Sequence, residues 1–246
     1  MSANESFILS DKINNKGVII NMIYITGDTH IPIDIHKLAT RYFPQQTEMT
    51  KSDYLIICGD FGGVWNNSRE EQYWIKWLNQ KNFTTLFVDG NHENYNLLNA
   101  YDVEQFHGGN VHKIADSIYH LMRGQVFEID GNTIFTMGGA TSHDKAYRKE
   151  NVSWWADELP NDAEYIEAEQ NLDRVNRKVD YIITHCAPDS VQQLFAYWYE
   201  KDKLTNFLES VSWSVDYKRW YFGHYHINKN VDDKHIVLYD AIVRME

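Results

Sequence analysis

Short apolar runs alternate with longer amphipathic segments along most of the chain. The apolar runs are five to seven residues long and rich in β-branched and aromatic residues, a composition that predicts strands. These runs cover residues 22–26, 54–58, 84–88, 117–122, 125–129, 133–137, 180–184, 218–222 and 235–241. Asp130-Gly131-Asn132 separates two of them, and Asp-Gly between β-rich runs predicts a hairpin.

The amphipathic segments predict helices. Their ranges are 37–42, a segment that begins after Ser68, 94–100, 162–178 and 189–211. Pro44 should stop the first helix, and the spacing from Ser68 to Glu71 predicts a capping box. The second helix carries its apolar residues, Tyr73, Trp74, Trp77 and Leu78, on one face. Strands alternating with helices, around a β-hairpin region, predict an α/β sandwich with mixed sheets.

Five polar clusters follow predicted strands, and each contains residue types that bind metals. They are Asp28-Thr-His30, Gly59-Asp60, Gly90-Asn91-His92-Glu93, His185 and Gly223-His224-Tyr-His226. Loops at the carboxyl ends of strands in α/β folds converge on one edge of the sheet and form the ligand site. We therefore expect the five clusters to meet in space.

The chemistry of these clusters suits two divalent metals held side by side. Residues two apart in an extended segment share a face, which pairs Asp28 with His30 and His224 with His226. The carboxylate of Asp60, at a glycine turn, is expected to bridge the metals. Two adjacent metals form a clamp suited to displacement at phosphorus. The pattern therefore predicts a phosphoester hydrolase.

The remaining residues of the third cluster have separate expected roles. Asn91 offers an amide oxygen to a metal, and His92 is expected to face the substrate as a general acid for the leaving oxygen.

Each cluster taken alone also has a structural explanation. Asp28 could form an Asx turn beside a surface His30, and Gly59-Asp60 could be a plain turn. The Asn91 segment could cap the helix that follows it, and His185 could be a core histidine. Five such segments in order, each after a strand, favour the metal interpretation over coincidence.

Charge and cysteine content narrow the class of partner and compartment. The 246 residues carry a formal net charge of -12, whereas proteins that bind duplex DNA present a basic surface to it. A small phosphorylated substrate stays compatible, because bound metals reverse the sign locally. Cys58 and Cys186 are expected as buried apolar residues, so a cytoplasmic location is expected. No apolar stretch approaches the roughly 20 residues of a membrane span.

Residues 22–246 are expected to form a single domain. Residues 1–21 are polar and rich in Asn, and they predict a flexible N-terminal extension outside the core. Met22 opens the first predicted strand and is an alternative natural start.

The ordered motifs Asp-x-His, Gly-Asp, Gly-Asn-His-Glu, His and Gly-His-x-His cover residues 28–226. With them the chain resembles the calcineurin-like metallophosphoesterase superfamily. The resemblance implies a four-layer α/β/β/α sandwich with two mixed sheets. It also implies two divalent metals, with a hydroxide that bridges them and attacks phosphorus. Manganese is the first expectation, with iron, zinc, nickel or cobalt as alternatives. The implied ligands are Asp28, His30, Asp60 and His226 for one metal, and Asp60, Asn91, His185 and His224 for the other.

One segment departs from the protein-phosphatase branch of that superfamily. Those enzymes extend Gly-Asp to Gly-Asp-x-x-Asp-Arg-Gly, whereas this chain reads Gly59-Asp60-Phe61-Gly62-Gly63. The difference weighs against a phosphoprotein phosphatase and leaves Glu93 without an identified partner. Residues 138–155, with Gly-Gly-Ala, Asp-Lys, an arginine and Trp-Trp, resemble a segment of bacterial and phage members.

The loop 138–160 is the expected specificity element. Arg123, Lys145 and Arg148 are candidates to bind a phosphate, and Trp154 and Trp155 to stack on a base. Hydrophobic packing under the loop is the alternative for the two tryptophans.

The sequence thus predicts hydrolysis of a small phosphomonoester or a nucleotide-type ester. Alternatives are a single-strand nuclease, a phosphoprotein phosphatase and, from another class, a metal-binding scaffold without catalysis. No duplex nucleic acid or membrane partner is expected, and the oligomeric state is not predicted.

Overall fold

The computed structural model describes residues 21–245. The predicted extension 1–21 therefore lies, apart from Asn21, outside the described residues. In the part of the chain that is described, no helix is both long and apolar enough to cross a bilayer.

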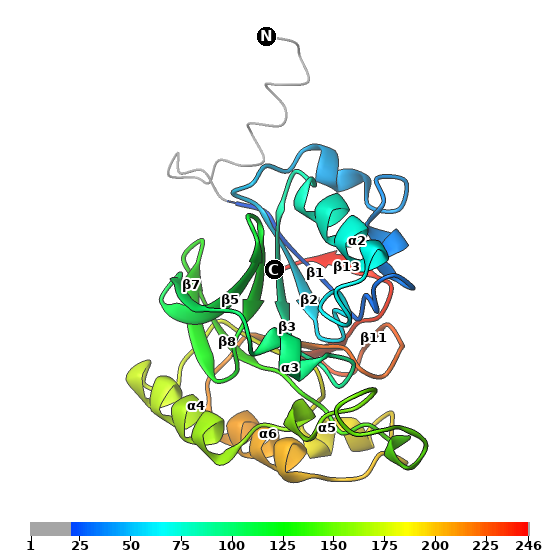
Figure 1. Cartoon of the computed structure of the whole chain (residues 1–246). Coiled ribbons are helices and arrows are strands. Elements are labelled where there is room, and N and C mark those ends of the chain that lie inside the picture. Colours follow the sequence, from blue (N-terminus) through cyan, green and yellow to red (C-terminus); the bar gives the residue numbers. More distant parts are fainter. Residues whose placement is uncertain (1–20, 246) are drawn as a thin grey trace, which may run out of the picture.

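Two mixed β-sheets form the centre of the fold (Figure 1). The seven-stranded sheet has the order β13-β1-β2-β3-β6-β5-β4 and the six-stranded sheet the order β11-β12-β10-β9-β8-β7. The first contains β13 (Ile242–Arg244), β1 (Ile23–Thr26), β2 (Tyr54–Cys58), β3 (Thr84–Val88), β6 (Ile118–Leu121), β5 (Gly109–Ala115) and β4 (Val103–Phe106). The second contains β11 (Lys229–Asn230), β12 (His235–Val237), β10 (Arg219–Phe222), β9 (Tyr181–Thr184), β8 (Asn132–Met137) and β7 (Gln125–Ile129).

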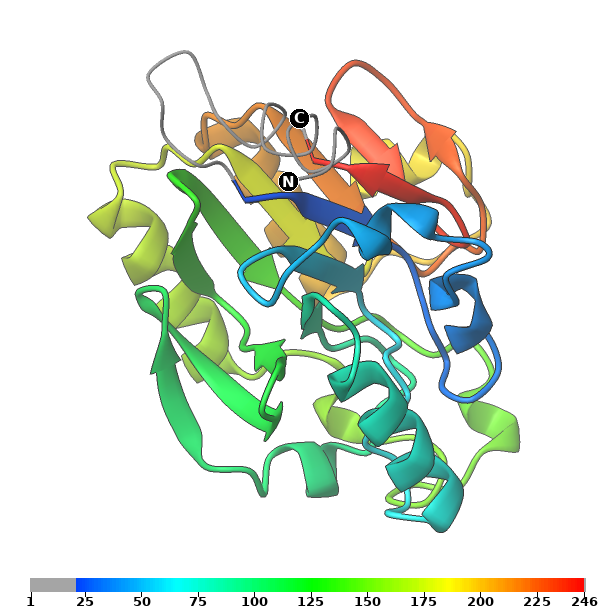
Figure 2. The same ribbon diagram turned by 90° about the horizontal axis from the view of Figure 1, so that it is seen from above.

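The central strands of each sheet run parallel. β1, β2, β3 and β6 are parallel neighbours in one sheet, and β8, β9, β10 and β12 in the other. Antiparallel strands lie at the margins, as Figure 2 shows for β13 beside β1. The carboxyl ends of the central strands therefore lie together at one end of each sheet.

The sheets pack face to face, and helices cover their outer faces. Alternate side chains of β1 point to opposite faces of the sheet. Ile23 and Ile25 pack in the core between the sheets, whereas Tyr24 packs in the core under the helix that follows β2. That helix is α2 (Arg69–Asn79), and the short α3 (Tyr95–Leu98) packs on the same side. The other sheet is covered by α4 (Asp162–Arg174), α5 (Asp189–Gln193) and α6 (Lys203–Ser214). The predicted four-layer α/β/β/α sandwich is confirmed.

Most predicted strands form, and the Asp130-Gly131 hairpin joins β7 to β8 as expected. The helix predicted at 37–42 is wrong. The structure has a 3-10 turn at Ile35–Leu38, and Pro44 begins a second one at Pro44–Thr47 because its fixed φ suits a first helical position. Two more 3-10 turns, Lys145–Tyr147 and Ala156–Glu158, lie within the predicted loop.

The predicted capping box at Ser68 forms only in part. The Ser68 hydroxyl accepts the Glu71 N–H at 3.2 Å. The Glu71 carboxylate instead accepts N–H groups of the preceding loop, including that of Trp65 at 2.9 Å.

Candidate metal centre

The five polar clusters meet at the carboxyl ends of parallel strands from both sheets. Asp28 and His30 follow β1, Asp60 follows β2, and Asn91 follows β3. His185 follows β9, and His224 and His226 follow β10. The sandwich therefore joins ligand candidates that are up to about two hundred residues apart in sequence.

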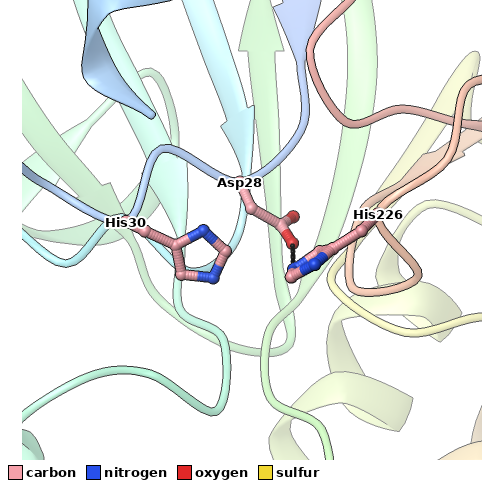
Figure 3. Close-up of side chains that lie close together, drawn as sticks. All are labelled: Asp28, His30 and His226. Atoms are coloured by element: carbon pink, nitrogen blue, oxygen red, sulfur yellow. Dashed lines mark ion pairs between the residues drawn. The ribbon is translucent and has the colours of Figure 1, made fainter. Parts of the chain in front are cut away.

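The first group lies around the Asp28 carboxylate. Figure 3 shows His30 and His226 approaching this carboxylate from opposite sides. Oδ2 of Asp28 lies 3.2 Å from Nε2 of His226, and Nε2 of His30 lies 3.1 Å from Oδ2 of Asp60. One ligand atom from each of Asp28, His30 and His226 can lie within 4.8 Å of the others, which is the spacing expected around a single cation.

The second group lies on the other oxygen of Asp60. Oδ1 of Asp60 is 3.2 Å from Nε2 of His185, and that nitrogen is 3.2 Å from Oδ1 of Asn91. The His224 ring lies beside them, with its centroid 4.9 Å from that of His185. Asp60 thus turns one oxygen toward each group, which is the geometry of a bridging carboxylate.

The orientation of the imidazoles fits metal binding. Nδ1 of His185 donates to the carbonyl oxygen of Cys58 at 2.7 Å, and Nδ1 of His30 donates to Asp34 at 2.8 Å. In each ring this leaves the Nε2 lone pair directed into the centre, as second-shell partners do in metal sites. Oδ2 of Asp28 is buried and makes no hydrogen bond to any described residue, although it lies within ion-pair distance of His226. This donor set fits two divalent cations with mixed nitrogen and oxygen ligation.

The electrostatics of the centre also call for cations. Asp28 and Asp60 are almost fully buried. Burial would lower the pKa of His185, but the carboxylates of Asp60 and Asp28 outweigh burial and raise the pKa to about 10. Burial would likewise raise the pKa of Asp60, but His185 and His30 hold it well below its ordinary value. In the metal-free chain, protonated imidazoles therefore balance the buried carboxylates.

Unusual backbone conformations are concentrated at the ligand candidates. His30, Asp60, His224 and His226 have φ values of 34°, 45°, 68° and 50°. Such values are uncommon outside glycine and persist where the surrounding structure requires them. The glycines permit close approach: a Cβ on Gly59 would lie 2.1 Å from Nδ1 of His185, and one on Gly90 would lie 2.1 Å from Oδ1 of Asp60.

His92 lines the open side of the centre. Its backbone N–H donates to Oδ1 of Asp60 at 2.7 Å, and its Nε2 lies 3.2 Å from Nη2 of Arg148. Burial and then the nearby Arg148 guanidinium lower the pKa of His92, against the opposing effect of Asp60. A ring nitrogen of His92 also lies within 4.8 Å of a ligand atom of His30 and of Asp60. The geometry of His92 is therefore compatible with metal contact as well as with substrate contact.

A cavity of about 240 Å³ opens over these residues. Besides members of both groups, it is lined by His92, His143, Asp144, Arg148, Tyr199 and Tyr225. Asp144 holds Arg148 through an ion pair of 2.7 Å. Of the predicted substrate contacts, the structure brings Arg148 to this cavity.

The other predicted substrate contacts lie elsewhere. Arg123 is buried, and its guanidinium forms an ion pair of 2.6 Å with Asp89. Trp155 is 1% exposed and packs edge-to-face on Trp65, in line with the packing alternative. Lys145 forms an ion pair of 2.5 Å with buried Glu158 and lies 5.0 Å from the centre of the Trp154 ring. None of these four residues is among those that line the cavity.

The structure supplies partners that sequence reasoning missed. The buried Glu93 carboxylate accepts the N–H of Phe61 at 2.7 Å and that of Gly62 at 3.4 Å, so it clamps the loop that carries Asp60. Asp34 had a usable signal, since it lies four residues after His30. Tyr199 had none, because it comes from a loop between α5 and α6 that no motif marks.

The family model for calcineurin-like phosphoesterases matches residues 22–228, which include every predicted ligand. Among curated proteins, no sequence matches the chain.

Proposed function

The chain belongs to the calcineurin-like phosphoesterase family, and from this premise we propose that it hydrolyses a small phosphate ester with two divalent metal ions. The position of Asp60, with one oxygen toward His30 and the other toward His185, is the observation that carries the proposal. Two bound metals would supply Lewis-acid polarisation of the phosphoryl group and a nucleophile at neutral pH.

The proposed ligands divide as the two groups do. Asp28, His30, Asp60 and His226 would hold one metal, and Asp60, Asn91, His185 and His224 the other. The last of these assignments rests on the ring position of His224 beside His185. Manganese is our first proposal for both positions. Mixed imidazole and carboxylate ligation is compatible with manganese, although this ligand set does not by itself distinguish manganese from iron, zinc, nickel or cobalt.

Arg148 and His92 are the proposed substrate residues. The Arg148 guanidinium faces the cavity beside the metal ligands, where it would donate two hydrogen bonds to a phosphoryl oxygen pair. His92 lies between this guanidinium and Asp60, where its imidazole would donate a proton or hydrogen bond to the leaving oxygen.

The size and charge of the cavity favour a small substrate. A volume of about 240 Å³ is below that of typical ligand pockets, so the remainder of a substrate would extend into solvent. The chain is acidic, with a formal net charge of -12, which disfavours a polyanionic strand. We therefore propose a phosphomonoester or nucleotide-type ester, ahead of a single-strand nuclease or a phosphoprotein phosphatase. A cytoplasmic location without a duplex or membrane partner is part of the same proposal.

Hydrolysis assays with two chromogenic esters test this function. Metal-free protein is reloaded with Mn²⁺ and assayed with p-nitrophenyl phosphate and bis-p-nitrophenyl phosphate. The expected result is metal-dependent hydrolysis that Asp60→Asn lowers by more than about 100-fold, since changes outside the ligand shell alone cost up to that much. Asp102→Asn, at an exposed carboxylate, is the matched control.

The outcomes separate the candidate functions. Preference for the monoester indicates a phosphatase, and preference for the diester a phosphodiesterase or nuclease. Activity no higher than that of Asp60→Asn on both esters, in protein that binds Mn²⁺, contradicts the proposal for these substrates and favours the scaffold alternative.

A further inference from the structure

The side-chain amide of Asn91 is held from both ends. Its Oδ1 lies 3.2 Å from Nε2 of His185, on the side of the proposed metals. Its Nδ2 donates to the Ser142 hydroxyl at 3.3 Å. An amide has one oxygen that can bind a cation and one NH₂ group that cannot. The orientation of this amide therefore decides whether Asn91 can be a ligand.

The Ser142 hydroxyl is itself oriented by a buried carboxylate. Its Oγ donates to Oε2 of Glu158 at 2.8 Å, and its backbone N–H donates to Oε1 of Glu158 at 3.0 Å. Glu158 is 0% exposed and Ser142 4% exposed. Because the only hydroxyl proton is committed to the carboxylate, the oxygen of Ser142 presents lone pairs to Asn91 and must accept.

Glu158 is fixed by two cationic side chains. Lys145 forms its ion pair of 2.5 Å with the carboxylate. Nη2 of Arg123 donates to the backbone oxygens of Asp157 at 2.8 Å and Glu158 at 3.3 Å. The same guanidinium pairs with Asp89, two residues before Asn91. One buried arginine thus fixes both the backbone that carries Glu158 and the loop that carries Asn91.

From these contacts we infer that Ser142, oriented by Glu158, is a positioning residue for the second metal. It holds the Asn91 amide with its oxygen toward His185 and Asp60, and the carboxylate charge fixes the direction of every hydrogen bond in the series. The inference rests on the proposed function only in that it needs a metal at this position. It assigns Lys145 to the support of Glu158 rather than to the substrate.

Metal binding by the full chain tests this role without an activity assay. Mn²⁺ is titrated into metal-free protein by calorimetry, and electron paramagnetic resonance distinguishes a coupled metal pair from a single ion. Ser142→Ala is expected to weaken one of two sites by about 10–100-fold, the usual effect of losing a second-shell partner. At equal metal, its spectrum should change from a coupled pair toward an isolated ion.

Two further variants guard against a purely structural effect. Ser142→Thr keeps the hydroxyl and should restore affinity. Ser142→Cys keeps similar volume with a weak acceptor and should show the same loss as Ser142→Ala. Ser153→Ala, a serine of the same loop that bonds to Lys149, is the matched control and should bind as the unmodified chain does.

A double-mutant cycle gives the decisive comparison. If Ser142 acts through the amide, Ser142→Ala should weaken Mn²⁺ binding in the natural chain but not in an Asn91→Ala background. Equal losses in both backgrounds, or wild-type affinity in Ser142→Ala, overturn the inference and leave the proposed function standing. If the unmodified chain binds no Mn²⁺ pair, the proposed function itself is contradicted.

Discussion

Individual carboxylates set the chemistry of the metal centre. Asp28 and Asp60 are 0% and 1% exposed, and burying an ionised carboxylate without compensation is very unfavourable. Compensation comes from imidazoles in the metal-free chain and would come from cations in the loaded one. The same buried carboxylates that make this a candidate metal site therefore make it unfavourable when no positive charge is present.

Substitution of Arg148 tests whether this residue contacts the substrate. Arg148→Ala is expected to lower kcat/KM by about 10–100-fold, since hydrogen bonds to charged groups contribute about 1.5–3 kcal/mol. It should also weaken inhibition by inorganic phosphate. Arg148→Lys should recover part of the loss, because an ammonium keeps the charge but not the paired donors. Steady-state kinetics on the preferred chromogenic ester measure both.

Lys149→Ala is the control for that experiment, since this neighbouring cation is exposed. Mn²⁺ affinity should be unchanged in both alanine variants. If Arg148→Ala and Lys149→Ala behave alike in kcat/KM and in phosphate inhibition, Arg148 is not a substrate residue.

Candidate ligands could be picked out from the sequence at this scale, and side-chain environment could not. Asp28, Asp60 and His185 are recognisable because metal ligation depends on residue type and on position after a strand. Arg123 has the charge expected of a phosphate contact, yet the structure buries it against Asp89. Charge is visible in the sequence, whereas burial depends on which distant residues fold over it.

Arg123 has a different role at the scale of elements. It connects the end of β3, through Asp89, to the 3-10 turn Ala156–Glu158 and to α4, through Glu164 at 3.4 Å. Burial would raise the pKa of Asp89, but Arg123 and His120 lower it below its ordinary range. Arg123→Ala should therefore destabilise the fold by about 3–5 kcal/mol, because it leaves a buried charge without its partner.

Urea unfolding of metal-free protein measures that effect. Arg174→Ala, an arginine in the last turn of α4, is the control and should cost much less. A folded Arg123→Ala variant with normal stability would contradict the structural role described here.

A pair of histidines joins β5 to β6 and gives the fold a pH dependence. His112 and His120 are cross-strand partners, with their Nδ1 atoms 3.1 Å apart. Burial and then His120 lower the pKa of His112 to about 4. Below its unfolded pKa of about 6.5, His112 binds a proton in the unfolded chain but not in the native one. Stability therefore falls as the pH drops from about 6.5 toward 4.

His112→Asn should remove this contribution. Between pH 7.5 and pH 5, the unmodified chain should lose about 2 kcal/mol more of its unfolding free energy than the variant. Urea titrations of the metal-free proteins at both pH values measure the difference. The exposed His36→Asn serves as control. An identical pH dependence in the unmodified chain and in His112→Asn would refute the assignment.

Strand prediction succeeded and failed for physical reasons. β1, β2, β3, β9 and β10 are buried, so their near-continuous apolar runs mark them in the sequence. β4 is largely exposed at the sheet edge, and β11 has two residues, so neither carries such a pattern. β13 was missed because its pairing with β1 is a long-range contact that no local signal specifies.

At the scale of the whole molecule, the candidate metal centre brings together residues from the two sheets. Asp28, Asp60 and Asn91 come from the seven-stranded sheet, and His185, His224 and His226 from the six-stranded one. The sheets otherwise meet through apolar side chains such as Ile25, Leu86 and Ile183. Convergence could be expected from strand order, but which loops face each other depends on how the sheets stack.

Metal binding should therefore stabilise the entire fold. A ligand at about 100 times its Kd adds about 2.7 kcal/mol for one site that is absent from the unfolded chain. For a chain of this size, 1 kcal/mol corresponds to about 2–4 °C in Tm, so the first metal should raise Tm by about 5–10 °C. Differential scanning calorimetry of metal-free protein with increasing Mn²⁺ measures the shift.

Asp60→Asn should show a much smaller shift, because Asp60 touches both groups, and Asp102→Asn should respond as the unmodified chain does. A Tm that does not respond to Mn²⁺ in the unmodified chain would mean that the two sheets do not share a metal centre.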